Sequence, residues 1–407
     1  MEVKAGYKRT EVGVIPDDWD LITLGQIFGF KNGLNKAKEF FGYGTPIINY
    51  MDVFRKAGLL NSDVLGRVCV NRNELKAYEV RKGDVFFTRT SETVEEIGIA
   101  AAMVEEPKDA VFSGFVLRAR PTDDSLDNEF KKYCFSARYF RQQVISRASY
   151  TTRALTNGRS LSAALLARPP VPEQRAIATA LSDADALIAS LEMLIAKKCD
   201  LRRAAIQQLL SGKIRLAGFA GEWETRRLGD VLRFQVGFPF PSGGFNENGT
   251  GVRIIRNRDL KDQNTGELYF GRAFDDAYVV RNGDVLVGMD GDFLVCLWSG
   301  GHALLNQRVG RIVCGKQLDS RFMYFRLAEP LKEIEAATSS TTVKHLSHRD
   351  VEKLTLALPG LEEQSAIATI LSDIDDELAA LEIRQIKAQA LKQGMMQALL
   401  TGRIRLA

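Results

Sequence analysis

The sequence has few of the residues from which metal and redox sites are built. Its 407 residues include three histidines and five cysteines. The cysteines, at positions 69, 134, 199, 296 and 314, form no close pair of the kind found in zinc or thiol–disulfide motifs. We therefore expect reduced, partly buried cysteines and no metal ion bound by this chain.

Several catalytic signatures are missing as well. The sequence has neither a P-loop nor the two-histidine helix of a zinc protease. A DNA adenine methyltransferase needs a Gly-rich cofactor loop and an Asn or Asp before two prolines and an aromatic residue. The adjacent prolines Pro169 and Pro170 lack both flanking residues. A hydrolase with paired carboxylates stays open, because acidic residues occur throughout and no pair stands out.

Long hydrophobic runs are also absent. No apolar stretch reaches the roughly 18 residues of a membrane span. Residues 1–5 lack the apolar core of a signal peptide. With 45% hydrophobic residues, the composition predicts a soluble cytoplasmic chain of about two to three domains, without membrane contact. The net charge of +4 and the pI near 8.7 indicate nucleic-acid binding only weakly.

What the sequence does contain is a long internal repeat. Residues 173–183 return as residues 363–373, which is 190 positions later, and the match continues without a gap to Ala407. Residues 19–25 similarly match residues 223–229, at an offset of 204. Such a period indicates a duplicated unit whose two copies have loops of different length, rather than a solenoid of short repeats.

Each copy of the repeat contains a predicted long helix. Apolar residues recur alternately three and four positions apart, and Gly212 and Gly402 stand where the helices should end. Each helix would be on the order of 55–60 Å long. The narrow apolar stripe favours an antiparallel coiled coil; the alternative, in which each helix covers its own domain, requires a wider apolar face. The predicted seam is Ile177, Leu181, Ala184, Ile188, Leu191 and Ile195 in the first helix, and Ile367, Leu371, Ile374, Leu378 and Leu381 in the second.

The repeat also predicts the order of the domains. We expect an α+β fold class, with two α/β-mixed domains separated by two long helices and related by a pseudo-twofold internal repeat. The predicted domains are residues 1–168 and 218–357, and the predicted spacer helices are residues 169–217 and 358–407. Within the domains we predict a turn with Gly83 or Gly283 at its tip before a short strand, and a helix near 126–146 and again near 321–336.

Polar and basic loop residues are candidates for DNA contact. Arg and Lys pair selectively with guanine, and Asn and Gln with adenine. In residues 149–160 and 339–349, serines and threonines come before basic residues. Solvated turns would have the same composition. The candidates in the first domain are Asn49, Arg89, Thr90, Ser91, Thr152, Arg153, Asn157 and Arg159. Those in the second are Arg256, Asn257, Arg258, Asn306, Gln307, Arg308, Thr342, Lys344 and His345.

Distinct motifs mark the ends of the repeated parts. They are the opening residues 6–19, the Glu-Gln pairs at residues 173–174 and 363–364, and the helix exits at residues 209–215 and 399–405. In this order, and over essentially the whole chain, they resemble the DNA specificity subunit of type I restriction–modification systems.

The resemblance implies two target-recognition domains, each reading one half of a bipartite, gapped DNA sequence. Because the two domains differ in sequence, the target should be asymmetric. The implied partners are double-stranded DNA, two modification subunits that methylate adenine with S-adenosylmethionine, and restriction subunits that cleave DNA with ATP and Mg²⁺ in bacterial defence. In such families the specificity subunit binds no cofactor and is not itself an enzyme.

Two other classes of function stay open from the residues alone. One is a stand-alone DNA methyltransferase or nuclease. The other is a coiled-coil scaffold without a role on DNA.

Overall fold

The computed structural model describes residues 4–150, 152–262, 267–338 and 344–406. The contacts within the chain divide it into two compact units. Unit 1 contains residues 1–192 and 383–407, and unit 2 contains residues 193–382. Each unit therefore combines one mixed helix-and-sheet domain with one half of each long helix.

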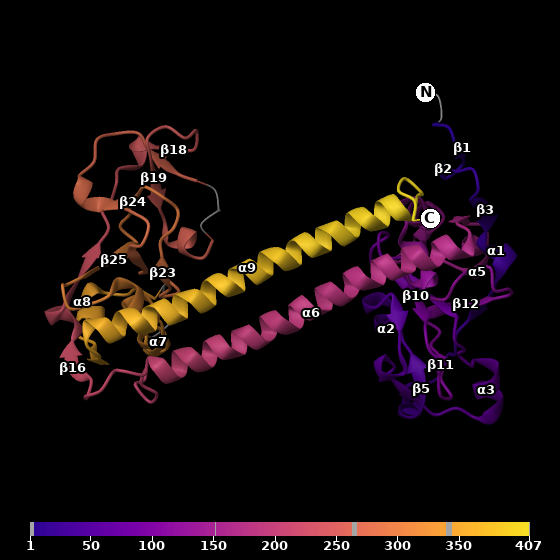
Figure 1. Ribbon diagram of the computed structural model, residues 1–407, viewed down its shortest axis with the longest axis horizontal. Coiled ribbons are helices and arrows are strands. Elements are labelled where there is room, and N and C mark those ends of the chain that lie inside the picture. Colours follow the sequence, from indigo (N-terminus) through magenta and orange to yellow (C-terminus); the bar gives the residue numbers. More distant parts are fainter. Residues whose placement is uncertain (1–3, 151, 263–266, 339–343, 407) are drawn as a thin grey trace. The chain divides into compact units, whose positions relative to one another are not determined.

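The two longest elements are α6 (Val171–Leu209) and α9 (Leu361–Leu399), with 39 residues each. Figure 1 shows them in magenta and yellow. Each is followed by a glycine with positive φ, Gly212 at 68° and Gly402 at 67°. That left-handed conformation disfavours other residue types and ends the helix where the sequence predicts it.

In unit 1 the first half of α6 packs against the second half of α9. Lys392 Nζ lies 2.5 Å from Asp185 Oδ1, and Gln385 donates to Glu192 at 3.2 Å. Because the later residue of α6 is bonded to the earlier residue of α9, the two helix segments run in opposite directions.

Unit 2 repeats this arrangement with the other two halves. Arg202 is paired with Asp375, and its Nη2 donates to Oδ2 at 3.2 Å. Lys198 is paired with Glu377. The Arg202–Asp375 pair stands at the same repeat positions as Lys392–Asp185 in unit 1, 190 residues away. The two copies of the repeat therefore use the same register in their own units.

Every residue of the predicted seam is buried or half-buried. Ile177 and Leu181 belong to the core of unit 1, together with Leu399 of α9. Ile367 and Leu371 belong to the core of unit 2, together with Leu209 of α6. Each helix thus starts in the core of one unit and ends in the core of the other.

The domain of unit 1 is built on a five-stranded sheet of order β4-β12-β8-β10-β6, with smaller sheets around it. Its central strand, β8, is buried at every residue and begins with three apolar residues, as expected for a strand covered on both faces. The strands are β1 (Tyr7–Thr10), β2 (Gly13–Pro16), β3 (Asp20–Thr23), β4 (Phe28–Asn32), β5 (Phe41–Ile48), β6 (Gly58–Leu59), β7 (Arg67–Val68), β8 (Val85–Thr88), β9 (Thr90–Ser91), β10 (Ala100–Met103), β11 (Val111–Phe112), β12 (Val116–Pro121), β13 (Ser149–Tyr150), β14 (Ala154–Leu155) and β15 (Leu165–Arg168). The shorter helices are α1 (Leu24–Ile27), α2 (Tyr50–Arg55), α3 (Arg72–Ala77), α4 (Arg138–Ser146) and α5 (Gly158–Ser162).

The domain of unit 2 has a four-stranded sheet of order β17-β25-β22-β23 and a five-stranded sheet of order β18-β20-β19-β24-β21. In the first sheet β25 lies between β17 and β22, as β12 lies between β4 and β8 in unit 1. The strands are β16 (Glu224–Arg227), β17 (Leu232–Val236), β18 (Phe245–Asn246), β19 (Val252–Ile255), β20 (Tyr269–Phe270), β21 (Val279–Val280), β22 (Val285–Gly288), β23 (Val295–Leu297), β24 (Ala303–Leu305), β25 (Val309–Cys314) and β26 (Thr355–Leu358). The remaining helices are α7 (Ser320–Ala337) and α8 (His348–Glu352).

Local predictions within the domains are confirmed in three places and wrong in one. Gly83 and Gly283 have φ of 85° and 92° just before β8 and β22, and α7 matches the predicted helix near 321–336. The predicted helix near 126–146 is wrong in its first half. There the chain forms short 3-10 turns, because Phe130, Tyr133 and Phe135 all enter the core, and residues so spaced cannot share one face of an α-helix.

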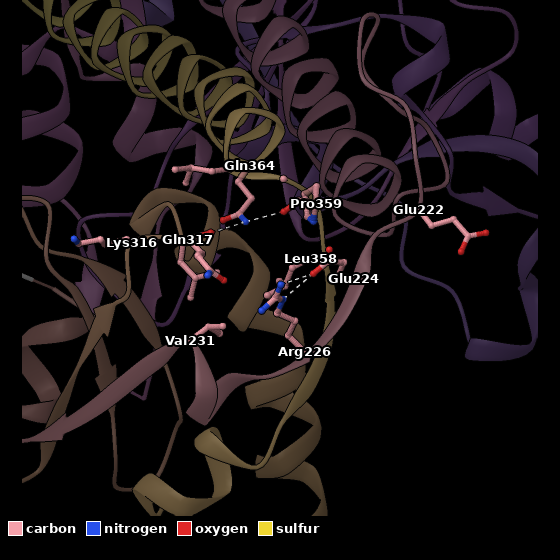
Figure 2. Close-up of a pocket in the computed structure, with 12 residues that line it drawn as sticks. Glu222, Glu224, Arg226, Val231, Lys316, Gln317, Leu358, Pro359 and Gln364 are labelled. Carbon is pink, nitrogen blue, oxygen red and sulfur yellow. Dashed lines mark hydrogen bonds and ion pairs between the residues drawn. The ribbon is translucent and has the colours of Figure 1, made fainter.

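A buried glutamine fixes the start of each long helix. In unit 2 the Gln364 side chain accepts from Asp319 N at 3.0 Å and donates to the carbonyls of Gln317 and Pro359 at 3.1 and 2.9 Å; Figure 2 shows the last two bonds. In unit 1 Gln174 makes the corresponding three bonds. These amides tie both helices to the domain of the unit in which they begin.

Within the described part of the chain, no helix is long and apolar enough to cross a membrane. In the same residues no three His, Cys, Asp or Glu side chains gather as a metal-binding group.

Candidate nucleic-acid interface

Each unit has a surface groove at the same place in its domain. Both grooves are lined by the loop after one buried strand, by a short helix and by the segment after the sheet's central strand. Groove 1, in unit 1, is lined by Tyr50, Met51, Phe54, Thr90, Ser91, Glu92, Glu96, Phe115 and Arg153. Groove 2, in unit 2, is lined by Arg256, Asn257, Arg258, Lys261, Asp290, Gly291, Asp292, Asn306 and Arg308.

The first wall of each groove is a tight turn between two strands. In unit 1 the turn joins β11 to β12, and Phe115 O accepts from Arg89 N at 3.1 Å. In unit 2 it joins β24 to β25, and Arg308 O accepts from Met289 N at 3.1 Å. The matching backbone bonds place Phe115 and Arg308 at the same position of the two grooves.

The second wall is a short helical turn with a carboxylate cap. Asn49 N donates to Asp52 Oδ2 at 2.8 Å before α2. Arg256 N donates to Asp259 Oδ2 at 2.8 Å before the 3-10 helix η7 (Asn257–Leu260). Burial raises the pKa of Asp52, and the Asn49 N–H partly opposes that shift. The caps align the helical turns, so the residues after them occupy equivalent positions in the two grooves.

The third wall comes from the segment before each long helix. Thr90 pairs with Leu155 across an antiparallel ladder in unit 1. Asp290 forms the equivalent antiparallel bridge with His345 in unit 2. The described parts of the two polar segments therefore adjoin the grooves at Leu155 and His345.

The side chains of groove 2 form a charged network. Asp290 is paired with Arg308 at 2.9 Å through Oδ2 and with His345 at 2.7 Å through Oδ1. Asn257 Nδ2 donates to Asp290 O at 2.5 Å, whereas its buried Oδ1 has no hydrogen-bond partner among the described residues. Arg258 is exposed at the edge of the groove. These guanidinium and amide groups are suited to phosphate oxygens and base edges.

The sequence comparisons point to one family. Residues 220–391 match the Type I restriction modification DNA specificity domain. The chain is 26% identical over 426 residues to a Methanocaldococcus jannaschii protein named as the MjaX type I restriction enzyme specificity subunit, covering 98% of this chain and 96% of that one. The chain is thus similar along nearly its whole length to a type I restriction enzyme specificity subunit. It is also 40% identical over 205 residues to the EcoBI specificity subunit of Escherichia coli, covering 49% of this chain and 42% of that one.

Solved structures of specificity subunits have a similar fold. The S subunit from M. genitalium is similar with a TM-score of 0.59 and 15% identity, over 98% of both chains. The HsdS subunit from Thermoanaerobacter tengcongensis is similar with a TM-score of 0.51 and 18% identity, over 96% of this chain and 98% of that one. At these identities the likeness concerns the fold, which is mixed helix and sheet with long helices.

These descriptions bear on catalysis as well. The matching family is a DNA specificity domain and the named relatives are specificity subunits. Neither is a catalytic subunit, which agrees with the expectation that this chain is not itself an enzyme.

Some of the candidate DNA contacts of this chain are engaged within the fold. Asn49 Nδ2 donates to the carbonyl of Ile47 at 3.2 Å, and Asn157 caps α5 by accepting from Ser160 N at 3.0 Å. Arg256 pairs with Asp259, and Lys344 donates to the carbonyl of Glu335 at 2.7 Å. These side chains hold the groove walls in place.

Other candidates present polar groups at or near the grooves. Thr90, Ser91 and Arg153 line groove 1, and Asn257, Arg258, Asn306 and Arg308 line groove 2, with His345 bonded to its wall. Thr152, Arg159 and Gln307 are exposed and Arg89 is half-buried, outside the lining of either groove. Thr342 lies outside the described residues.

The sequence reasoning missed the apolar part of groove 1 and the acidic part of groove 2. Tyr50, Met51, Phe54 and Phe115 were not candidates, because the selective hydrogen bonds to base edges come from polar and basic side chains. Asp290 was missed as well. Alignment of the two copies would have placed Phe115 opposite the candidate Arg308, which is a signal available from the repeat.

Proposed function

We propose that this chain is the sequence-specific DNA-binding subunit of a type I restriction–modification system. Unit 1 and unit 2 each read one half of an asymmetric bipartite target. The observation that supports this most directly is the pair of grooves, which share their backbone frame and differ in their side chains. Two grooves with the same backbone arrangement and different side chains are suited to two half-sites of different sequence.

In this proposal α6 and α9 form an antiparallel coiled coil that sets the distance between the half-sites. The support is the heptad spacing of the buried positions and the recurrence of the Lys392–Asp185 pair as Arg202–Asp375. Both helices are single continuous elements of 39 residues. A continuous helix of that length acts as a stiff spacer of about 58 Å.

The proposed partners carry the chemistry. Two modification subunits with S-adenosylmethionine would methylate adenine, and restriction subunits with ATP and Mg²⁺ would cleave DNA. One solved relative, 16% identical with a TM-score of 0.55, is described in terms of complex assembly of the type I system. The duplicated frame supports two copies of one partner, since the paired helix positions recur in both copies of the repeat.

The proposal is tested by mobility shift with and without the modification subunits, across a series of salt concentrations. We expect specific binding of duplex DNA in the presence of the modification subunits, and an affinity that falls steeply with salt because phosphate contacts release counterions. Absence of any binding would favour the scaffold alternative. Transfer of labelled methyl groups to DNA by the chain alone would favour the stand-alone methyltransferase.

A further inference from the structure

The two grooves carry contrasting side chains on matched backbone positions. At five matched positions groove 1 has an aromatic, aliphatic or hydroxyl side chain, and groove 2 has an amide, an imidazole, a carboxylate or a guanidinium. The matched positions, with unit 1 first, are Tyr50 and Asn257, Met51 and Arg258, Thr90 and Asp290, Phe115 and Arg308, and Leu155 and His345. Because the frame is shared, this contrast in chemistry must distinguish what the two grooves recognise.

We propose that groove 1 reads thymine methyl groups, chiefly with Phe115 and Met51, and that groove 2 reads guanine with Arg258 and Arg308. This inference rests on the proposed function, since both grooves must face base edges in the major groove. Thymine presents an apolar C5-methyl group there, whereas guanine presents the O6 and N7 acceptors that match a guanidinium. The half-site of unit 1 therefore contains thymine, and that of unit 2 contains guanine.

Phe115 is a fixed apolar side chain in solvent. Its backbone is held by the bond from Arg89 N to Phe115 O and by the bond from Phe115 N to Ser113 Oγ, at 3.1 and 3.2 Å. Its side chain is nevertheless 62% exposed. The turn thus holds the backbone by two hydrogen bonds while it leaves the ring exposed, as a direct reader of base edges requires.

The neighbouring residues make this apolar surface continuous. Met51, 43% exposed, lines the same groove. Tyr50 and Phe54 stack beside it, with ring centroids 5.8 Å apart and planes inclined by 16°. A single exposed apolar residue is ordinary on a protein surface, but a group gathered in one groove indicates a binding surface.

The charges in groove 1 do not favour guanine. Arg153 is the one guanidinium in its lining, and its Nη2 lies 3.9 Å from Glu92 Oε1. Glu96, the other carboxylate, accepts from Ser91 Oγ at 3.2 Å. Carboxylates repel phosphate and guanine O6, and they accept hydrogen bonds from the cytosine amino group. Apolar contact with thymine is consistent with this balance, whereas arginine readout of guanine is not.

Groove 2 has the arrangement that guanine requires. Asp290 binds both Arg308 and His345, so the Arg308 guanidinium is oriented before DNA arrives. Arg258 is exposed, and its side chain has no ion pair with any residue in the described ranges. It is therefore available for two hydrogen bonds to one base.

The test uses the chain with its modification subunits and duplexes of the mapped target carrying base analogues. Deoxyuridine in place of thymine removes only the C5-methyl group, and 7-deazaguanine removes only the N7 acceptor. The double variant Arg258→Ala, Arg308→Ala first identifies the half-site of unit 2, which is the half-site whose recognition it changes. We expect deoxyuridine to weaken binding about fourfold per contacted methyl in the other half-site, and 7-deazaguanine to weaken it about tenfold in the unit 2 half-site.

Variants separate the readers from the fold. Phe115→Ala and Met51→Ala should abolish the discrimination between thymine and deoxyuridine while leaving the melting temperature unchanged, since both side chains are largely outside the core. Leu65→Ala is the matched control, because Leu65 is 78% exposed in unit 1 and does not line groove 1. It should leave discrimination intact.

The outcomes distinguish this inference from the proposed function. If the unaltered chain with its modification subunits bound no DNA sequence specifically, both this inference and the proposed function would be contradicted. Specific binding with equal affinity for thymine and deoxyuridine in the unit 1 half-site would overturn this inference alone. Insertion of Phe115 between base pairs would give that result, because it does not depend on the methyl group. A unit 1 half-site without thymine would overturn it as well.

Discussion

Arg405 donates from Nε to Oε1 of Glu173 at 2.6 Å, across 232 residues of sequence. The Glu173 side chain is 5% exposed, so this bond ties the last turn of the chain to the start of α6. In unit 2 Arg215 binds Glu363 in the same way, at 2.6 Å. The pair shows that the end of each long helix closes the unit in which the other helix begins.

The first prediction concerns this closure. Arg405 also binds Asp18, and the Glu173 and Asp18 carboxylates raise the pKa of Arg405 above its ordinary value. We expect Arg405→Ala to lower the free energy of unfolding of unit 1 by about 2 kcal/mol, because it leaves the buried Glu173 carboxylate without its cation. Hydrogen exchange resolved by unit would measure the loss.

Arg403→Ala is the control for that variant. Arg403 carries the same charge in the same turn and is exposed. An equal loss of protection in the two variants would show that net charge, and not the Arg405–Glu173 bond, stabilises unit 1.

The second prediction concerns the buried glutamine at the start of α9. Gln364→Ala leaves the Asp319 N–H and two carbonyls without their partner, so we expect unit 2 to lose about 2–3 kcal/mol of stability. Denaturant unfolding of the full chain would show a lower midpoint. Gln397→Ala removes an exposed glutamine from the same helix and should be neutral. The role given to Gln364 would be contradicted if the two variants unfolded alike.

The third prediction uses the equivalence of the two copies. A fragment of residues 1–217 lacks the second half of α9 but carries the equivalent half of α6, including Arg202, Leu209 and Arg215. These stand at the repeat positions of Lys392, Leu399 and Arg405. We expect two fragments to exchange these segments and form a dimer, visible by light scattering, whose target with modification subunits is a palindrome of the unit 1 half-site. A monomer at micromolar concentration would contradict the exchange.

The fourth prediction concerns the proposed spacer. Seven residues inserted after Glu192 in α6 and after Arg384 in α9 keep the alternating three-and-four spacing. They lengthen both helices by about 10 Å, or about three base pairs. The gap between the half-sites should grow accordingly while the half-site sequences stay unchanged. Insertion of three residues at the same points breaks the heptad register and should reduce stability instead. An unchanged gap in the longer variant would exclude the helices as the ruler.

The helical part of the fold could be predicted because its signal is repeated and local. Ile177 and Leu181 recur as Ile367 and Leu371, and the spacing alone identifies their buried face. The helix predicted near residue 126 failed for a tertiary reason. Phe130, Tyr133 and Phe135 are all buried in the core of unit 1, which local periodicity does not reveal.

The sequence identified groove residues only where their side chains are polar or basic. Arg258 and Arg308 were found because their side chains match base edges. Asn49 and Arg256 were also chosen on residue type, yet both side chains are bonded within the fold. Asn49 Nδ2 donates to the carbonyl of Ile47, and Arg256 pairs with Asp259 three residues later. Phe115 was missed because an apolar side chain in a loop has no polar signature. Its exposure depends on the turn that holds it.

The most direct test of the central claim is to sequence methylated adenines in cells that contain the modification subunits together with this chain or its Arg258→Ala, Arg308→Ala variant. We expect one asymmetric motif of two half-sites around a fixed gap. In the variant, the half-site of unit 2 should relax while the other half and the gap stay unchanged. A motif without two separated halves, or a variant that changes both halves equally, would contradict the assignment of one half-site to each unit.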